Sequence, residues 1–134
     1  MYNILSTILA SMAMVLGLVF CRTKGERHQI GSSDVKAFLA IRYPNVPVTL
    51  ADGEYVFVDL NEWKRMFLKV ITMLRPYIRN VRDCDDFADF LKGIIAMLFA
   101  VNTCFRVSGT NAEGQAHAFN LILFWNNGKL DADL

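Results

Sequence analysis

The spacing of apolar residues changes near Val101, and this change most limits the folds open to the chain. Before Val101, two segments carry apolar residues at helical intervals, which predicts two helices that each bury one face. These positions are Trp63, Met66, Phe67, Val70, Ile71 and Leu74 in one segment and Phe87, Phe90, Leu91, Ile94, Ile95 and Leu98 in the other. After Val101, the runs "TCFRV", "AHAFNLILFW" and "KLDADL" are typical of strands. We therefore expect an α+β domain in which a helical half precedes a small antiparallel sheet.

Capping residues predict where the two helices begin. Asp59 and Glu62 form a capping box that opens the first helix, which should run to about Leu74. Asp83 is placed to cap the second helix, so that Cys84 becomes its first residue.

Upstream of these helices, the pattern predicts one more helix and a hairpin. A helix over 34–43 should stop before Pro44, which cannot continue it. The run "VPVTLADGEYVFVD" predicts two short strands around Asp52-Gly53. Residues 22–33 are polar and glycine-containing, which is typical of a linker, so the domain should occupy residues 34–134.

The N-terminal segment, residues 1–21, has no charged side chain and is long enough to cross a bilayer core of about 30 Å as a helix. We expect it to be a membrane anchor or an uncleaved signal. The basic residues Arg22, Lys24 and Arg27 follow it, which favours a membrane-associated protein whose domain is cytoplasmic. A lipoprotein-like box at "LVFC", which would place the domain outside the cell or in the envelope, and a buried helix of the domain remain as alternatives.

Charge gives little sign of nucleic acid binding. The chain has 14 Lys and Arg against 13 Asp and Glu, and no basic run is interleaved with aromatic residues. We therefore expect no nucleic acid partner.

The three cysteines are too few and too irregularly spaced for a disulfide framework or a Cys-x-x-Cys zinc site. Cys21 belongs to the apolar segment, and Cys104 is expected in a buried strand. Cys84 differs because it stands in the acidic run "RDCDDFADFLKG".

A cysteine in the first turn of a helix can act as a nucleophile, because the unpaired backbone amides there favour a thiolate. Asp85 and Asp86 oppose this by raising the pKa of a nearby thiol, and an imidazolium partner could offset them. His117 is the candidate base, since the only other histidine, His28, lies in the predicted linker.

The motifs "DCDDFADFLKG" and "GQAHAFNLILFW" together resemble the papain-like cysteine protease domain of certain fungal lectins and of many phage and bacterial proteins. The likeness spans about residues 34–134. It implies a papain-like fold in which the helix of the nucleophile packs on the sheet, with Cys84 as nucleophile and His117 as base.

Two features of that family are less clear in this chain. The histidine is usually oriented by an acid on the next strand, for which Asp131 or Asp133 could substitute. A two-residue turn at Asn127-Gly128 would point both aspartates away from His117, whereas a three-residue loop would place Asp133 on its face. We favour Asp133. The chain ends before the acid run that the family shows, so the domain could be truncated at its C-terminus.

The second feature is an oxyanion hole, for which the backbone amide of Cys84 and the side chain of Asn80 are the candidates. Asn120 is expected to hydrogen bond within the sheet, and Trp125 to pack against the helices.

The preferred hypothesis is a membrane-tethered cysteine hydrolase that acts on peptide or protein substrates, or a transglutaminase-like acyl transferase, with no cofactor and no metal. The alternative is a non-catalytic binding or accessory domain that keeps the fold. A divalent cation site at Asp83, Asp85, Asp86 and His117 is a weaker hypothesis, because successive carboxylates diverge around a helix.

Overall fold

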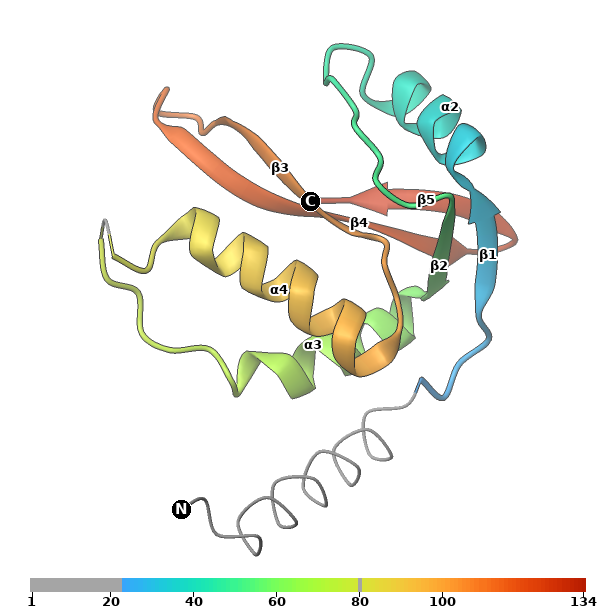
Figure 1. The fold of residues 1–134 in the computed structure, drawn as a ribbon, viewed down its shortest axis with the longest axis horizontal. Helices are drawn as coiled ribbons and strands as arrows, with labels where there is room; N and C mark the ends of the chain where they lie inside the picture. Colours follow the sequence, from blue (N-terminus) through green and yellow to red (C-terminus); the bar gives the residue numbers. More distant parts are fainter. Residues whose placement is uncertain (1–22, 80) are drawn as a thin grey trace, which may run out of the picture.

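The computed structural model describes residues 23–79 and 81–134, in which the chain forms three helices and one mixed five-stranded sheet (Figure 1). The predicted α+β class is therefore confirmed. The elements are β1 (His28–Gly31), α2 (Ser32–Arg42), β2 (Glu54–Asp59), α3 (Leu60–Ile71), α4 (Cys84–Phe99), β3 (Cys104–Thr110), β4 (Ala116–Asn126) and β5 (Lys129–Asp133).

Strand β4 is the centre of the sheet. It pairs antiparallel with β3, from Cys104 opposite Ile122 to Thr110 opposite Ala116, and antiparallel with β5 at its other end. It also pairs in parallel with β2, at Val58 opposite Phe124, which the expected antiparallel sheet did not include. The connection from β2 to β4 contains α3 and α4, and a connection of that length is what a parallel pair requires.

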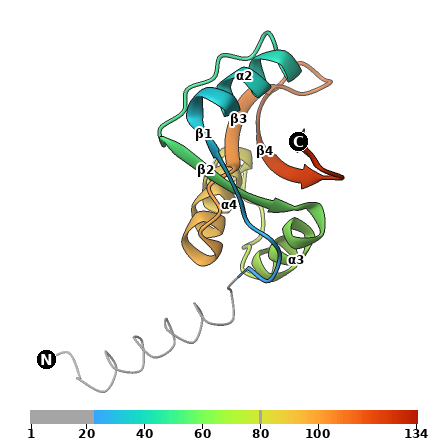
Figure 2. The ribbon, with the colours of Figure 1, turned by 90° about the vertical axis from the view of Figure 1, so that its right-hand side faces the viewer.

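Helices cover both faces of the sheet, with α2 on one side and α3 and α4 on the other (Figure 2). On the α4 side, Trp63 and Phe99 pack with Ile122 and Phe124. On the α2 side, Leu39 packs with Leu121 and Leu123. Successive side chains of β4 thus alternate between the two layers. Even-numbered residues of β4 face α3 and α4, and odd-numbered residues face α2.

The predicted caps of α3 and α4 lie where the sequence placed them. The Asp59 side chain accepts a hydrogen bond of 2.9 Å from the backbone N–H of Glu62. At α4, Asp83 and Asp86 form a reciprocal capping box, in which the N–H of Asp83 donates to Asp86 Oδ2 at 3.2 Å.

The predicted hairpin around Asp52-Gly53 was wrong. Residues 47–51 form no strand, and β2 pairs instead with β1, which lies within the segment expected to be a linker. The hydrogen bond from the N–H of Ser32 to the carbonyl of Gly53, 2.9 Å long, closes this pair at one end.

The proposed membrane segment, residues 1–21, and the candidate Asn80 lie outside the described residues. Among the residues that are described, no helix has both the length and the apolar composition needed to cross a membrane.

The turn between β4 and β5 contains the two residues Asn127 and Gly128, with φ angles of 50° and 82°. Two successive positive φ angles match a type I′ hairpin turn. We expect Gly128→Ala to lower the free energy of unfolding by about 1–2 kcal/mol, because alanine is strained in the left-handed region. Urea unfolding would measure this loss. Gly53→Ala is the matched control, since Gly53 has no positive φ and no atom within 4 Å of an added Cβ, and its stability should change little.

Candidate functional site

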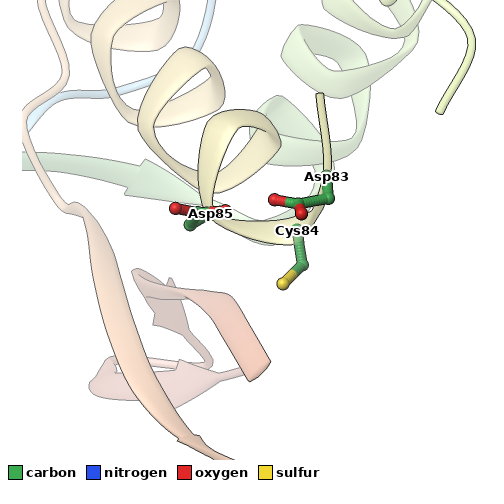
Figure 3. Close-up of side chains that lie close together, drawn as sticks. All are labelled: Asp83, Cys84 and Asp85. Carbon is green, nitrogen blue, oxygen red and sulfur yellow. The ribbon is translucent and has the colours of Figure 1, made fainter. Parts of the chain in front are cut away.

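Cys84 is the first residue of α4, and its side chain is half-buried at the end of this helix. The carboxylates of Asp83 and Asp85 lie beside it, so that one ligand atom of each of the three residues falls within 4.8 Å of the others (Figure 3). In the part of the chain that the structure describes, no hydrogen bond is made by the Cys84 thiol.

Negative charge is concentrated at this end of α4. A hydrogen bond with Asp83 is the main cause that lowers the pKa of Asp85, and the backbone amide of Asp85 and the charge of Arg106 act in the same direction. The carboxylate of Asp85 is therefore ionised at neutral pH. It repels a thiolate on Cys84, whereas the N-terminus of α4 attracts one.

Three ligand atoms from Asp83, Cys84 and Asp85 do not make a calcium site, since calcium takes 6–8 oxygens. The predicted fourth ligand, His117, is not part of this group.

His117 lies on β4 opposite Gly109 and is exposed. Its ring makes an edge contact with Phe119, with ring centroids 4.9 Å apart. Because residues two apart share a face of a strand, His117 belongs to the side of Phe119 and Leu121, which is the side covered by α2.

Asn120 shows where α4 lies relative to this strand. Its side-chain amide donates a 2.9 Å hydrogen bond to the carbonyl of Ala88, in the second turn of α4. Asn120 is three residues from His117, so the two side chains point to opposite faces of β4. The structure therefore brings Cys84 and His117 to the same end of α4 and β4 but does not join them by a hydrogen bond. Proton transfer between them would require His117 to leave its present orientation.

The preference for Asp133 as the orienting acid was wrong. The turn is the two-residue form, so Asp133 pairs with Ile122 and shares its face, opposite to that of His117. Asp131 pairs with Phe124 on that same face, where its carboxylate accepts a 3.2 Å hydrogen bond from Asn126.

Two aromatic neighbours were not predicted. His28, expected in a linker, stacks on Trp125 with centroids 4.6 Å apart and on Phe57 at 5.4 Å. Trp125 therefore stacks on a histidine of β1, a contact that the sequence did not predict. The pairing of β1 with β2 creates this contact, and no local pattern in "HQIG" signals it.

Cys104 is buried in the core, as predicted, with 1% of its surface exposed. Burial raises the pKa of its thiol to about 12. The Cys104 thiol is therefore inert toward alkylation while the domain is folded.

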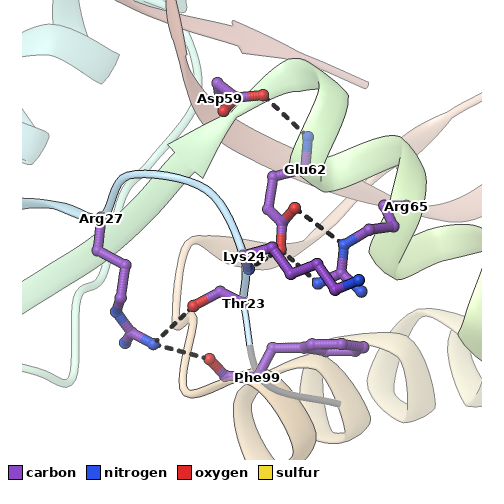
Figure 4. Close-up of polar contacts among 7 residues, drawn as sticks. All are labelled: Thr23, Lys24, Arg27, Asp59, Glu62, Arg65 and Phe99. Atoms are coloured by element: carbon purple, nitrogen blue, oxygen red, sulfur yellow. Dashed lines mark hydrogen bonds and ion pairs between the residues drawn. The ribbon is translucent and has the colours of Figure 1, made fainter. Parts of the chain in front are cut away.

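A polar cluster that sequence reasoning missed surrounds the buried carboxylate of Glu62 on α3 (Figure 4). Its carboxylate accepts a 2.8 Å hydrogen bond from the backbone N–H of Lys24 and pairs with the guanidinium of Arg65. Nearby, Arg27 donates to the carbonyls of Phe99 and Ala100 at the end of α4. The cluster fixes residues 24–27, which follow the apolar N-terminal segment, against α3 and α4.

Comparison of the chain with protein-family models, with curated proteins and with solved structures gave no significant match.

Proposed function

We propose that this chain is a non-catalytic binding domain attached to a membrane by residues 1–21. The observation that carries this proposal is that α4, which begins at Cys84, contacts one face of β4 through Asn120, whereas His117 lies on the opposite face of that strand. A nucleophile and its base must lie within hydrogen-bonding reach to exchange a proton. The register of β5, which turns Asp133 away from His117, supports the same conclusion.

The basic residues after the apolar segment support a cytoplasmic position of the domain at the membrane surface. The contacts that fix residues 24–27 support a domain that is held close to the membrane, because they hold the chain against α3 and α4 from Lys24 onward.

A papain-like cysteine hydrolase is the second candidate, favoured by the position of Cys84 at the N-terminus of α4 and by the motifs shared with that family. In that reaction, the Cys84 sulfur attacks a peptide carbonyl carbon while the thiol proton passes to His117. His117 then protonates the leaving amine, and water hydrolyses the thioester.

Alkylation of the thiols distinguishes the two functions. In the full chain in detergent micelles, we expect iodoacetamide to label Cys84 at the same rate in the wild type and in His117→Ala, because the imidazole does not contact the thiol. Peptide mapping by mass spectrometry measures the rate at each cysteine. His28→Ala is the matched control, and the inert Cys104 reports whether each variant is folded.

The hydrolase would be supported, and the binding proposal overturned, if His117→Ala slowed the labelling of Cys84 by about tenfold or more while His28→Ala did not.

A further inference from the structure

Strand β3 lies at one edge of the sheet, since within the described residues it pairs only with β4. The backbone N–H of Leu123 donates to the carbonyl of Thr103 at 3.0 Å, which makes these two residues a closely bonded pair. Bonded positions alternate along an antiparallel pair, so the backbone groups of Arg106, Ser108 and Thr110 point away from β4. They are available to another strand.

A slot of about 330 Å³ runs along this edge. Four consecutive residues of β3, Phe105 to Ser108, line it. Alternate side chains of a strand point to opposite faces, so four consecutive residues can line one cavity only if the edge itself faces it. The segment Val46 to Leu50, which forms no strand and no ladder with β3, also lines the slot.

The two sides of the slot differ in chemistry. On the α2 side its lining is apolar, with Leu39, Phe105 and Leu121. On the α4 side it carries the cations Lys92 and Arg106. Arg106 lies 3.6 Å from Asp89, with 38% and 62% of the two side chains exposed, and its charge also acts on Asp85. Exposed ion pairs are weak, so they leave the Arg106 cation open to a ligand carboxylate.

We infer that this slot binds an extended acidic peptide segment of a partner protein, which adds a strand to β3. Side chains of an added strand alternate between the two faces, so the segment that fits has apolar residues at every second position and Glu or Asp between them. We choose a partner protein over a second copy of this chain, because a β3–β3 pair centred on Arg106 would place two like charges opposite each other. The inference rests on the proposed binding function and names its partner.

The test uses the full chain and a fluorescein-labelled peptide of alternating valine and glutamate, with binding followed by fluorescence anisotropy. We expect saturable binding to the wild type, and about tenfold or more weaker binding when lysine replaces glutamate in the peptide. Methylation of the peptide amides that face β3 should weaken binding similarly, because it removes the donors that pair with the strand.

Ser108→Pro removes an outward-facing N–H inside the slot and should weaken binding by about tenfold or more. Thr110→Pro is the matched control, since Thr110 has the same orientation but lies outside the slot, and its binding should match the wild type. Protection of Cys104 from iodoacetamide verifies folding of both variants.

Equal binding by the methylated and unmethylated peptides, or no saturable binding at millimolar peptide, would overturn the inference. Either result leaves the thiol labelling experiment unaffected, so failure of this inference is distinguishable from failure of the proposed function.

Discussion

Trp63→Ala should destabilise the domain by about 3–5 kcal/mol, the usual cost of removing a fully buried aromatic side chain. Trp63 is 0% exposed and packs in the core between α3, α4 and the sheet. Its indole N–H also donates a 2.8 Å hydrogen bond to the carbonyl of Leu123 on β4. The substitution therefore leaves both a cavity and a buried carbonyl without its donor. Urea unfolding monitored by circular dichroism would measure the loss.

Two further tryptophan variants separate the causes. Trp63→Phe keeps most of the volume and removes the hydrogen bond, so its loss should be nearer 1–3 kcal/mol, about the value for an unsatisfied buried group. Trp125→Ala removes a partly exposed ring that stacks on His28, and a smaller loss than that of Trp63→Ala is expected. Equal losses for Trp63→Ala and Trp125→Ala would contradict the position of Trp63 at the centre of the core.

The parts of the fold that could be predicted are those that local chemistry determines. Asp59 and Asp83 cap α3 and α4 because a carboxylate at that position satisfies backbone amides a few residues away. The Asn127-Gly128 turn is similar, since Asn-Gly accepts the positive φ angles of a two-residue hairpin. Here the preference for a three-residue loop was wrong, although the Asn-Gly pair itself favours the two-residue turn that the structure shows.

Strand pairing between distant segments could not be predicted in the same way. β1 is four residues long and has no strong apolar alternation, so nothing in its sequence favours β2 over a neighbouring segment as its partner. The failure of the predicted hairpin follows from this, because β2 uses one of its edges for β1.

The geometry of the candidate site depends on which face of β4 is covered by α4, and the sequence of β4 does not show this. Residues 121–124 of β4 are all buried, because helices cover both faces of the sheet. A strand that is apolar on both faces does not reveal which face α4 covers. The motif could therefore predict Cys84 and His117 as neighbours. Only the hydrogen bond between Asn120 and Ala88 shows that α4 covers the face of β4 opposite to His117.

Glu62→Gln should lower the free energy of unfolding by about 1.5–3 kcal/mol at neutral pH, the range for hydrogen bonds to charged groups. The Glu62 carboxylate is 6% exposed and bonds both Arg65 and the backbone of Lys24. Glutamine keeps the shape of the side chain but lacks the charge that pairs with the guanidinium. Chemical unfolding of the two proteins at a series of pH values would measure the difference.

The difference should depend on pH in a defined direction. The hydrogen bond from Arg65 is the main cause that lowers the pKa of Glu62 below its ordinary value of 4.5, against the opposing effect of burial. A group whose pKa is lower in the folded state stabilises the fold at pH values above its unfolded pKa and loses this effect as the pH falls through the folded pKa. The stabilities of wild type and Glu62→Gln should therefore begin to converge as the pH falls below 4.5 and should meet only below the lower pKa that Glu62 has in the folded state. Glu113→Gln, in the exposed loop between β3 and β4, should change stability by no more than about 0.5 kcal/mol. A loss in Glu62→Gln that stayed constant on acidification would show that shape, and not charge, is what Glu62 contributes to holding residues 24–27 against α3.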